Sequence, residues 1–246
     1  MDRSLYIAMN GAKQTLMAQT TNANNLANSQ TTGFKADLEQ SRSMPVFGPG
    51  YPSRVYAMTE SPGTDLTAGP LAMTGRDLDV AINGEGWLVI EGADGKEAYT
   101  RAGDLRLTTE GLLQTGTGLA VMGNNGPIAI PPSEKLTIGS DGTISIIPQG
   151  ANATALAVLD RIKLVKPDLG QLEKQNDGLL YLKDGGVSPE DASVRLIQGA
   201  LEGSNVSTVG AMVEMIELAK NFELQTKVMK QADENSGISA KLMQMA

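Results

Sequence analysis

Apolar side chains recur with a helical period at the beginning of this 246-residue chain. Over residues 3–28 they alternate in steps of four and three, which places them at the a and d positions of about three heptads. These positions are Leu5, Met9, Ala12, Leu16, Gln19, Ala23 and Leu26. Asn28 and Gly33 follow, and both tolerate the left-handed backbone that ends helices. We therefore expect one long helix over residues 3–28.

A second helical pattern covers residues 207–245. Its apolar positions again alternate by three and four, and further aliphatic residues widen the stripe. The stripe comprises Met212, Met215, Ala219, Phe222, Thr226 and Met229, widened by Val209, Val213, Ile216 and Val228. Asn205 or Ser207 can supply the oxygen that caps the first free N–H groups. Methionine in such a stripe is typical of gap-filling packing rather than of a cofactor site.

The pattern between residues 65 and 202 is different, with many short alternating runs separated by Gly-containing turns. Residues 78–82 alternate in this way, residues 87–90 form an apolar run after the Gly84/Gly86 turn, and the Gly-Ala-Asp-Gly turn at 92–95 is typical of a hairpin. This pattern predicts an antiparallel all-β barrel or irregular sandwich. Residues 44–64 are rich in Pro, Gly and Ser and predict an extended connector.

The expected fold is therefore α+β: long N- and C-terminal helices pair as a coiled-coil-like stalk and flank a central, mostly antiparallel all-β domain. The expected domains are an N-terminal helical assembly segment (1–43), an extended connector (44–64), a central β domain (65–204) and a C-terminal helical assembly segment (205–246).

The N-terminal helix carries an unusual surface, because no charged residue occurs from Gln14 to Phe34. A surface helix normally carries charges on its outer face, so an uncharged polar back indicates contact on more than one side. The alternative is a polar tail that stays disordered. Stacking many copies would bury both sides, and such a non-closing contact generates a filament or tube.

Composition excludes whole classes of function. The chain has no His and no Cys, which removes Ser-His-Asp triads, thiol nucleophiles, disulfides and Cys- or His-based metal sites. The formal net charge of −8 disfavours binding to nucleic acid. We expect no membrane insertion, because no apolar run approaches the length of about 20 residues that spans a bilayer. The N-terminus lacks the pattern of a cleaved secretory signal, so the chain stays in the cytosol or leaves by another route.

The search for chemistry finds few candidates. There is no nucleotide-binding or nucleophile-elbow motif. Asp77 with Asp79, or Asp94 with Asp104, could form a carboxylate pair for glycoside chemistry, although such residues beside Gly are mostly turn and surface residues. We therefore expect no catalytic, metal or cofactor site. A carbohydrate-active enzyme or binding module with helical tails, and a monomeric adaptor, are the alternatives from other classes.

Four segments stand in a fixed order along the chain: residues 24–28 (NNLAN) with 31–35 (TTGFK), residues 74–87, residues 99–113, and residues 201–206 (LEGSNV). Together they resemble the motifs of the bacterial flagellar rod and hook proteins, essentially from end to end. The short connector over residues 36–76 and the Gly86-Trp87 pair are most similar to the proximal rod member. A distal rod member, or another rod or hook paralog, is the alternative.

The resemblance implies a non-enzymatic subunit of the proximal rod, the drive shaft that transmits torque from the motor to the hook and filament. Implied partners are other copies of itself, other flagellar rod proteins and the flagellar type III export apparatus. The implied location is the basal-body rod that spans the periplasm, reached without a cleaved signal peptide. Terminal helices would pack around an export channel, and the ends would be disordered before assembly.

The resemblance also implies residue roles. The family motif would shape the exit from the first helix and the entry to the last one through Asn25, Leu26, Asn28, Thr32, Gly33, Phe34, Lys35, Glu202, Gly203, Ser204 and Asn205. The assembly interface would comprise Leu5, Met9, Ala12, Leu16, Ala23, Leu26, Met212, Ile216, Ala219, Phe222 and Met229. The alternative for each residue is packing within one subunit. A positive φ at Gly33 would make a β-branched substitution there costly.

Overall fold

The computed structural model describes residues 3–45, 55–149 and 157–244. The chain divides into two compact units, which we name the helical unit (Met1–Asn28, Asp37–Gly63 and Val206–Ala246) and the β unit (Ser29–Ala36 and Thr64–Asn205). The chain thus has long terminal helices that contact each other and antiparallel sheets between them in sequence, which confirms the predicted α+β class.

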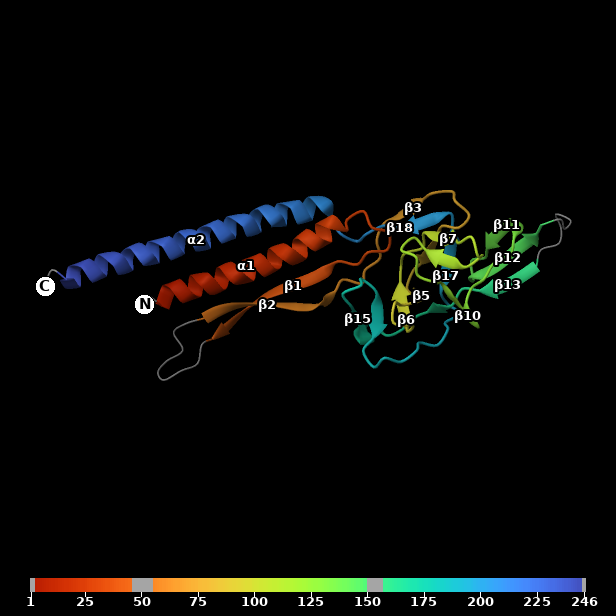
Figure 1. Cartoon of the computed structure of the whole chain (residues 1–246), viewed down its shortest axis with the longest axis horizontal. Helices are drawn as coiled ribbons and strands as arrows, with labels where there is room; N and C mark the ends of the chain where they lie inside the picture. The colour runs from red at the N-terminus through yellow and green to blue at the C-terminus, as the bar shows by residue number, and fades with distance from the viewer. Residues whose placement is uncertain (1–2, 46–54, 150–156, 245–246) are drawn as a thin grey trace. The chain divides into compact units, whose positions relative to one another are not determined.

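The helical unit contains two long helices, α1 (Arg3–Ala27) and α2 (Thr208–Gln244), which lie side by side (Figure 1). Helix α1 ends where its sequence predicts, and the amide of Asn28 donates from Nδ2 to the carbonyl of Asn24 at 3.0 Å. Helix α2 begins with Ser207 as its cap, because the Ser207 Oγ accepts a hydrogen bond from Gly210 N at 3.2 Å. Both helix ends therefore follow from local sequence.

The helical unit also contains a two-stranded ribbon, formed by β1 (Asp37–Pro45) and β2 (Val55–Thr64). The predicted connector over residues 44–64 thus includes a paired strand. The ribbon lies along α1, and Asn10 Nδ2 donates to the carbonyl of Ala57 at 2.7 Å (Figure 1). Gln14 Oε1 accepts from Thr59 N at 3.0 Å. The uncharged polar side of α1 is therefore a docking surface that satisfies backbone groups of the ribbon.

The β unit is built from short strands in small antiparallel sheets. The strands are β3 (Leu71–Met73), β4 (Val80–Asn83), β5 (Trp87–Glu91), β6 (Glu97–Thr100), β7 (Leu105–Leu107), β8 (Leu113–Thr115), β9 (Met122–Gly123), β10 (Gly126–Pro127), β11 (Ser133–Ile138), β12 (Thr143–Pro148), β13 (Ala157–Arg161), β14 (Leu164–Val165), β15 (Leu172–Lys174), β16 (Leu180–Leu182), β17 (Arg195–Gln198) and β18 (Ala200–Glu202). One 3₁₀ turn, η1 (Leu169–Gln171), precedes β15.

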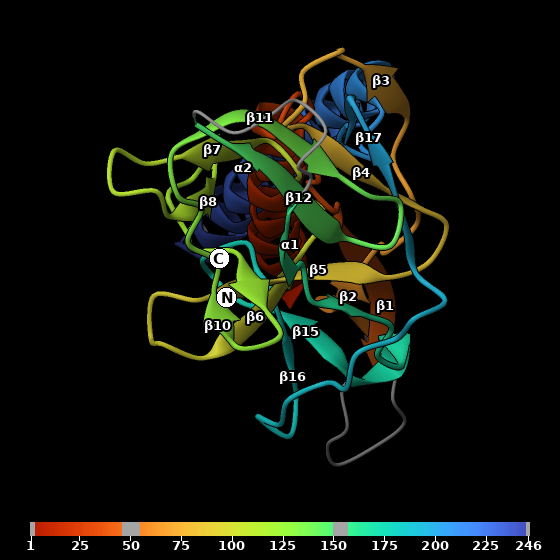
Figure 2. The ribbon, with the colours of Figure 1, turned by 90° about the vertical axis from the view of Figure 1, so that its right-hand side faces the viewer.

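The largest sheet of the β unit has the order β14-β5-β6-β16-β15, and a second sheet has the order β11-β12-β13. Figure 2 shows β11 and β12 adjacent to each other. Two-stranded sheets pair β17 with β4, β18 with β3, β7 with β8, and β9 with β10. Paired strands run antiparallel throughout these sheets, as the alternating pattern predicts.

Strand β5 lies at the centre of the β unit, because its residues 87–90 are buried on both faces. Leu88 and Ile90 point into the larger apolar core, whereas Trp87 and Val89 belong to a second core with Tyr99. Side chains of a strand alternate between its two faces, so a run of four apolar residues is what a strand buried on both sides requires. The β unit therefore has apolar cores packed on both faces of this strand.

Candidate assembly surface and junction cluster

Helix α1 faces α2 with small side chains. Ala8, Ala12, Ala18 and Asn22 are buried, and Gly11 lies against Gln225. Asn22 Nδ2 donates to the carbonyl of Ala211 at 2.8 Å, which satisfies a buried amide between the helices. Because Asn22 lies opposite Ala211 and Gly11 lies opposite Gln225, the two helices run antiparallel.

Helix α2 faces α1 mainly with larger side chains. Met215, Leu218, Phe222 and Met229 are half-buried there, between the buried residues Ala211 and Ala232. These positions are spaced four, three, four, seven and three residues apart, which is a heptad seam. Large side chains of α2 thus pack over small side chains of α1, and the contact within the chain uses one stripe of each helix.

Helix α2 also carries a second apolar stripe, on its opposite side. Val209, Val213, Ile216 and Leu224 are about half-exposed or more, and Ile216 is 68% exposed. At about 100° per residue, the centre of this stripe lies about 180° from the centre of the seam that contacts α1. Met212, Val228, Ile238 and Leu242 extend the stripe, in which Lys220 and Lys227 are also exposed. A helix with two opposite apolar faces has a second face available for packing.

Helix α1 has an exposed apolar face as well. Tyr6, Met9, Leu16 and Met17 are each close to half-exposed, and Lys13 lies among them. On the helical wheel these residues avoid both the stripe that contacts α2 and the polar side that contacts the ribbon. The side chains of Met9, Leu16 and Met17 on this face are therefore about half-exposed in the described part of the helical unit.

The predicted interface residues fall into three groups in the structure. Met9, Leu16, Ala23, Met212, Ile216 and Ala219 are exposed; Leu5, Leu26, Phe222 and Met229 are half-buried; and Ala12 is buried. Phe222, Met229 and Ala12 lie in the seam between α1 and α2. The part that each residue plays between subunits stays a prediction.

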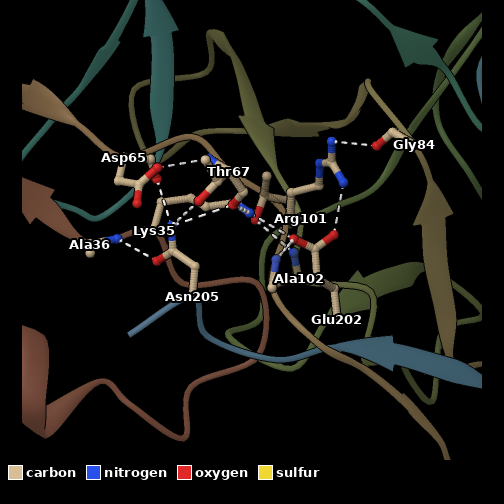
Figure 3. A network of polar contacts seen from close by, with 11 residues as sticks. Lys35, Ala36, Asp65, Thr67, Gly84, Arg101, Ala102, Glu202 and Asn205 are labelled. Atoms are coloured by element: carbon tan, nitrogen blue, oxygen red, sulfur yellow. Dashed lines mark hydrogen bonds and ion pairs between the residues drawn. The ribbon is translucent and has the colours of Figure 1, made fainter. Parts of the chain in front are cut away.

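The β unit contains a buried ionic cluster that we name the junction cluster: Lys35, Arg101, Glu202 and Trp87. Lys35 Nζ lies 2.7 Å from Glu202 Oε1, and Arg101 Nη1 lies 2.8 Å from Glu202 Oε2 (Figure 3). The backbone N–H of Gly69 donates to Glu202 Oε1 at 3.0 Å. All three charged side chains are at least 96% buried. One carboxylate thus pairs with cations from two distant segments of the chain.

The aromatic ring of Trp87 compensates the second cation of the junction cluster. Its centroid lies 5.0 Å from the Arg101 guanidinium and 5.9 Å from Lys35 Nζ, within the range of cation–π attraction. Burial alone raises the pKa of Glu202, but hydrogen bonds from Lys35 and Gly69 and the charges of Arg101 and Lys35 together hold this pKa below its ordinary value. Glu202 is therefore ionised at neutral pH.

The junction cluster joins the segments through which the chain enters and leaves the β unit. Gly33 N donates to the main-chain carbonyl of Glu202 at 2.8 Å. Gly33 has a φ of +68°, and a Cβ placed there would lie 2.3 Å from the backbone of Ala102. The structure thus has the positive φ at which a β-branched substitution of this glycine would be strained. Only glycine combines that backbone angle with so close an approach.

Asn205 makes a second connection between these segments. Its Oδ1 accepts from Ala36 N at 2.8 Å, and its Nδ2 donates to the carbonyl of Asp65 at 2.8 Å (Figure 3). Phe34 lies under the ammonium of Lys174, 4.1 Å from Nζ to the ring centroid. The motif residues after the first helix thus dock on the β unit, which anchors residues 29–36 there.

The remaining motif residues lie around these contacts. Inside the helical unit, the Asn25 side chain makes two hydrogen bonds of 2.9 Å with the backbone of Asp37. Its Nδ2 donates to the Asp37 carbonyl, and its Oδ1 accepts from Asp37 N. Thr32 is half-buried, Ser204 is buried, and Gly203 N donates to the carbonyl of Pro70 at 2.8 Å. The sequence analysis missed that Arg101 and Trp87 complete the cluster. Both lie in segments singled out as motifs, but spacing does not show that they meet Lys35 and Glu202.

The structure also places the acidic residues that were candidates for glycoside chemistry. Asp79 is buried, where it lies 3.0 Å from Arg76 Nη2 and accepts from Thr74 Oγ1 at 2.7 Å. Asp77 is exposed. Asp79 is therefore a structural acceptor inside the fold, which does not support the alternative of a carboxylate pair with Asp77 for glycoside chemistry.

Metal binding and membrane spanning are further functions on which the described residues bear. No group of His, Cys, Asp and Glu side chains in residues 3–45, 55–149 and 157–244 has the arrangement of a metal site. Across the same ranges, neither long helix is apolar enough to cross a membrane.

Three family models match the chain in order. "Flagella basal body rod protein" matches residues 5–35, "Flagellar hook protein FlgE/F/G D1 domain" matches residues 81–146, and "Flagellar basal body rod FlgEFG protein C-terminal" matches residues 197–242. These matches include most of the motif residues that dock on the β unit, and most of the two helices.

Curated relatives match over the full length. The flagellar basal-body rod protein FlgF of Salmonella typhimurium is 42% identical over 252 residues, covering 100% of both chains. FlgF of Escherichia coli is 41% identical, also over 100% of both chains. The rod protein FlgG of Bacillus subtilis is 32% identical over 95% of this chain and 96% of its own. The predicted resemblance is thus confirmed, and similarity to these FlgF proteins exceeds similarity to this FlgG. The chain belongs to the flagellar basal-body rod protein family, whose members are structural rather than enzymatic.

Proposed function

We propose that this chain is a structural subunit of the proximal part of the flagellar rod, at the position of the FlgF proteins it resembles. There it helps to transmit torque from the motor to the hook and filament. The observation that carries the proposal is the second apolar stripe of α2, centred on Val209, Val213 and Ile216, on the side away from α1.

The energetics support assembly through these stripes. Fully burying an aliphatic side chain contributes about 1.5–3 kcal/mol relative to leaving it exposed. Val209, Met212, Val213 and Ile216 follow each other within the first turns of α2 and are each more than half-exposed. Burial of such a group against a neighbouring helix offsets the entropy lost when subunits associate. Because the face on α1 is distinct, one subunit has separate surfaces for different neighbours.

The proposed partners are other copies of this chain and other flagellar rod proteins, arranged with the terminal helices around an export channel. We further propose export through the flagellar type III apparatus without a cleaved signal, and a position in the part of the rod that spans the periplasm. Neither nucleic acid nor membrane insertion enters the proposal.

The predicted segments of the chain and their roles are part of the same proposal. Residues 1–43 and 205–246 would act as assembly segments, residues 44–64 as the connector, and residues 65–204 as the β domain. Lys35, Glu202 and Asn205 would hold the chain segments next to the two assembly helices on the β domain, which is supported by the buried Lys35–Glu202 ion pair and the part-buried hydrogen bond of Asn205.

Complementation tests the proposal. Cells that lack the gene should not swim, and the wild-type chain should restore swimming. Leu16→Asp and Ile216→Asp should each fail to restore it, because a charge on either stripe opposes burial. Glu217→Asp, an exposed change on α2, is the matched control and should restore swimming.

The isolated variants must also be folded for this result to count. Trp87 fluorescence should be unchanged in Leu16→Asp and Ile216→Asp, because both residues are exposed and lie outside the β unit. Normal swimming with both variants would refute assembly through these stripes. Basal bodies of the deletion strain, viewed by electron microscopy, should lack a complete rod.

The proposal also differs from a monomeric adaptor in solution behaviour. Limited proteolysis of the purified chain should leave a resistant β unit and remove residues of α1 and α2 early, because the helix pair buries mostly small side chains. Protected helices in a stable full-length monomer would favour the adaptor.

A further inference from the structure

The β unit contains a cavity that the proposed function does not use. Its volume is about 490 Å³, within the range of about 300–1,000 Å³ that small-ligand pockets occupy. Its walls come from the start of β6, the turn between β9 and β10, the residue before β14, and the loop after β16. The lining includes Glu97, Met122, Asn124, Lys163, Val187 and Glu190.

A mostly buried ion pair lies in the wall of this cavity. Lys163 Nζ lies 2.6 Å from Glu97 Oε1, and the two side chains are 13% and 17% exposed. The backbone positions both groups, because Lys163 N donates to the carbonyl of Met122 at 2.9 Å and Glu97 is the first residue of β6. The ion pair is therefore a fixed polar feature of the cavity.

The loop wall of the cavity is held by hydrogen bonds as well. Ser188 N donates to the hydroxyl of the buried Tyr99 at 3.0 Å. Asp191 N donates to the carbonyl of Leu164 at 3.0 Å. A cavity that is formed before binding loses less conformational entropy when a ligand enters.

Glu97 also has an acceptor atom that the fold does not satisfy. Its second carboxylate oxygen, Oε2, is enclosed and has no hydrogen-bond partner among residues 3–45, 55–149 and 157–244. Leaving a buried acceptor without a donor is unfavourable, and more so when the group is charged. The last torsion of a Glu side chain is broad, so rotation of the carboxylate can turn this oxygen toward the cavity that Glu97 lines. A ligand that donates a hydrogen bond there would satisfy it.

The charges around the cavity favour a cation over an anion. Among the described residues that line it, Glu97 and Glu190 are acidic and Lys163 alone is basic. Glu91 lies directly opposite Glu97 in the pairing of β5 with β6, so a third carboxylate projects from the same side of these strands. A ligand with one positive charge would reduce this excess of negative charge.

Apolar side chains stand beside these charges. Met122, Val187 and Pro189 line the cavity, and Val187 is 63% exposed. Aliphatic chains that end in a charged group pack their methylenes on apolar surface and keep the charge among polar groups. The cavity combines both kinds of surface.

We propose that this cavity binds an alkyl cation, an ammonium or guanidinium group on an aliphatic chain such as Lys and Arg side chains carry. The cation donates to Glu97 Oε2, Lys163 keeps its contact with Oε1, and the aliphatic chain packs on Met122 and Val187. The two sources of this chemistry are a side chain of a neighbouring protein and a free small amine. The site lies within the β unit, so it does not depend on assembly through the helices.

Titration of the purified full-length chain with n-butylammonium tests the site. n-Butanol has nearly the same size without the charge, and butyrate carries the opposite charge. Saturable shifts of the backbone amide NMR signals of Asn124, Ser188 and Glu190 are expected with n-butylammonium and not with the other two compounds. Equal shifts with n-butanol, or no saturable shift with n-butylammonium, would overturn the proposal.

Two variants test the assigned acceptors. Glu97→Gln should weaken n-butylammonium binding about tenfold or more, because it removes the charged acceptor and keeps the size of the side chain. Glu190→Gln should weaken it about two- to fivefold, since Glu190 is exposed. Glu110→Gln is the matched control for net charge, because Glu110 is exposed and does not line the cavity, and it should leave the affinity unchanged.

The fluorescence of Trp87 shows whether each variant is folded. Unchanged affinity in folded Glu97→Gln would contradict the proposal. If Glu97→Gln disturbs the fold, Glu190→Gln decides, and unchanged affinity in that variant would contradict the proposal in the same way.

Swimming distinguishes the two sources of the cation. Glu97→Gln and Glu190→Gln should reduce swimming if a side chain of a neighbouring protein fills the cavity, whereas Glu110→Gln should not. Variants that bind n-butylammonium weakly and swim normally assign the site to a free amine. The titration is made on the isolated chain, so its failure leaves the proposed rod function intact, and failure of the rod function leaves the titration intact.

Discussion

The β unit and the helical unit differ in how much of their apolar side-chain surface is buried. Leu88, Ile90, Leu105 and Leu113 are at most 1% exposed in the β unit. In the helical unit, Met212, Val213 and Ile216 are more than half-exposed, while the contact between α1 and α2 buries mainly alanines. The β unit buries these large apolar side chains in its own core, whereas the helical unit leaves its own exposed. Substitutions in the core of the β unit should therefore change folding. Substitutions in the exposed stripes of the helical unit should change assembly.

The largest expected effect tests whether the β unit depends on its buried charges. Glu202→Ala removes the carboxylate and leaves Lys35 and Arg101 buried without their partner. Breaking a buried ion pair in this way costs about 3–5 kcal/mol. Urea unfolding followed by the fluorescence of Trp87, the single tryptophan of the chain, measures the change.

Glu223→Ala is the matched control for this experiment. Glu223 pairs with Lys227 at 2.7 Å on α2, but both side chains are more than 60% exposed, so no measurable change is expected. Equal stability of the wild type and Glu202→Ala would show that the β unit does not need its junction cluster.

The next effect separates close packing from backbone strain. Gly33→Ala and Gly75→Ala both place a side chain at a positive φ, +68° and +71°. A Cβ at Gly33 meets backbone at 2.3 Å, whereas a Cβ at Gly75 meets nothing within 4 Å. Strain alone costs about 1–2 kcal/mol at Gly75, and the clash should raise the loss at Gly33 to about 3 kcal/mol or more. Similar values in urea unfolding would argue against tight docking of residues 29–36.

A smaller change in stability is expected when the pH is lowered. The pKa of Glu202 is held below its ordinary value of 4.5, mainly because hydrogen bonds and charges of Lys35, Gly69 and Arg101 outweigh burial. Its stabilising contribution is therefore fully present above pH 4.5 and is lost as pH falls through the lower folded pKa. The difference in unfolding free energy between the wild type and Glu202→Gln should be constant near neutral pH and shrink in acid. A difference that stays constant in strong acid would contradict this assignment.

The smallest effect concerns the helical unit alone. Burial raises the pKa of Glu39 on β1; a hydrogen bond with Thr21 opposes the rise and the charge of Glu214 adds to it. The ionised form of Glu39 is thus less favourable in the folded state, so stability falls as pH rises through this region. Glu39→Gln should slightly raise the helical melting temperature at neutral pH in far-UV circular dichroism, and Glu217→Gln should not. A lower melting temperature for Glu39→Gln would show that its contact with Thr21 matters more.

Much of the architecture was predictable from short-range patterns. The three-and-four spacing of apolar residues located α1 and α2 to within one residue at each end, because a helix end depends on local caps such as Asn28 and Ser207. The apolar run at residues 87–90 after the Gly84/Gly86 turn located β5. Strand β3, with three exposed residues, and β13 were missed, because neither has the apolar alternation that marks a half-buried strand.

The candidate sites were predictable only in part. The motif resemblance singled out Lys35, Glu202 and Gly33, and each makes a buried or close contact. It did not identify Arg101 and Trp87 as their partners, because Arg101 meets Glu202 across 101 residues and Trp87 meets Lys35 across 52, and such contacts depend on how the sheets pack. A pattern read along the chain contains no information on such distances.

The amino-acid order alone was enough to establish two amphipathic terminal helices, a strand-rich middle and membership of a rod family, because periodicity, caps and motifs are local properties. Tertiary structure alone decided which stripe of each helix is used within the chain. Ala8, Ala12 and Ala18 let α2 approach closely, so its large side chains fill that space and the stripe around Ile216 stays outside. Hydrophobicity marks both stripes of α2 equally, and only the fit of small against large side chains distinguishes the inner one.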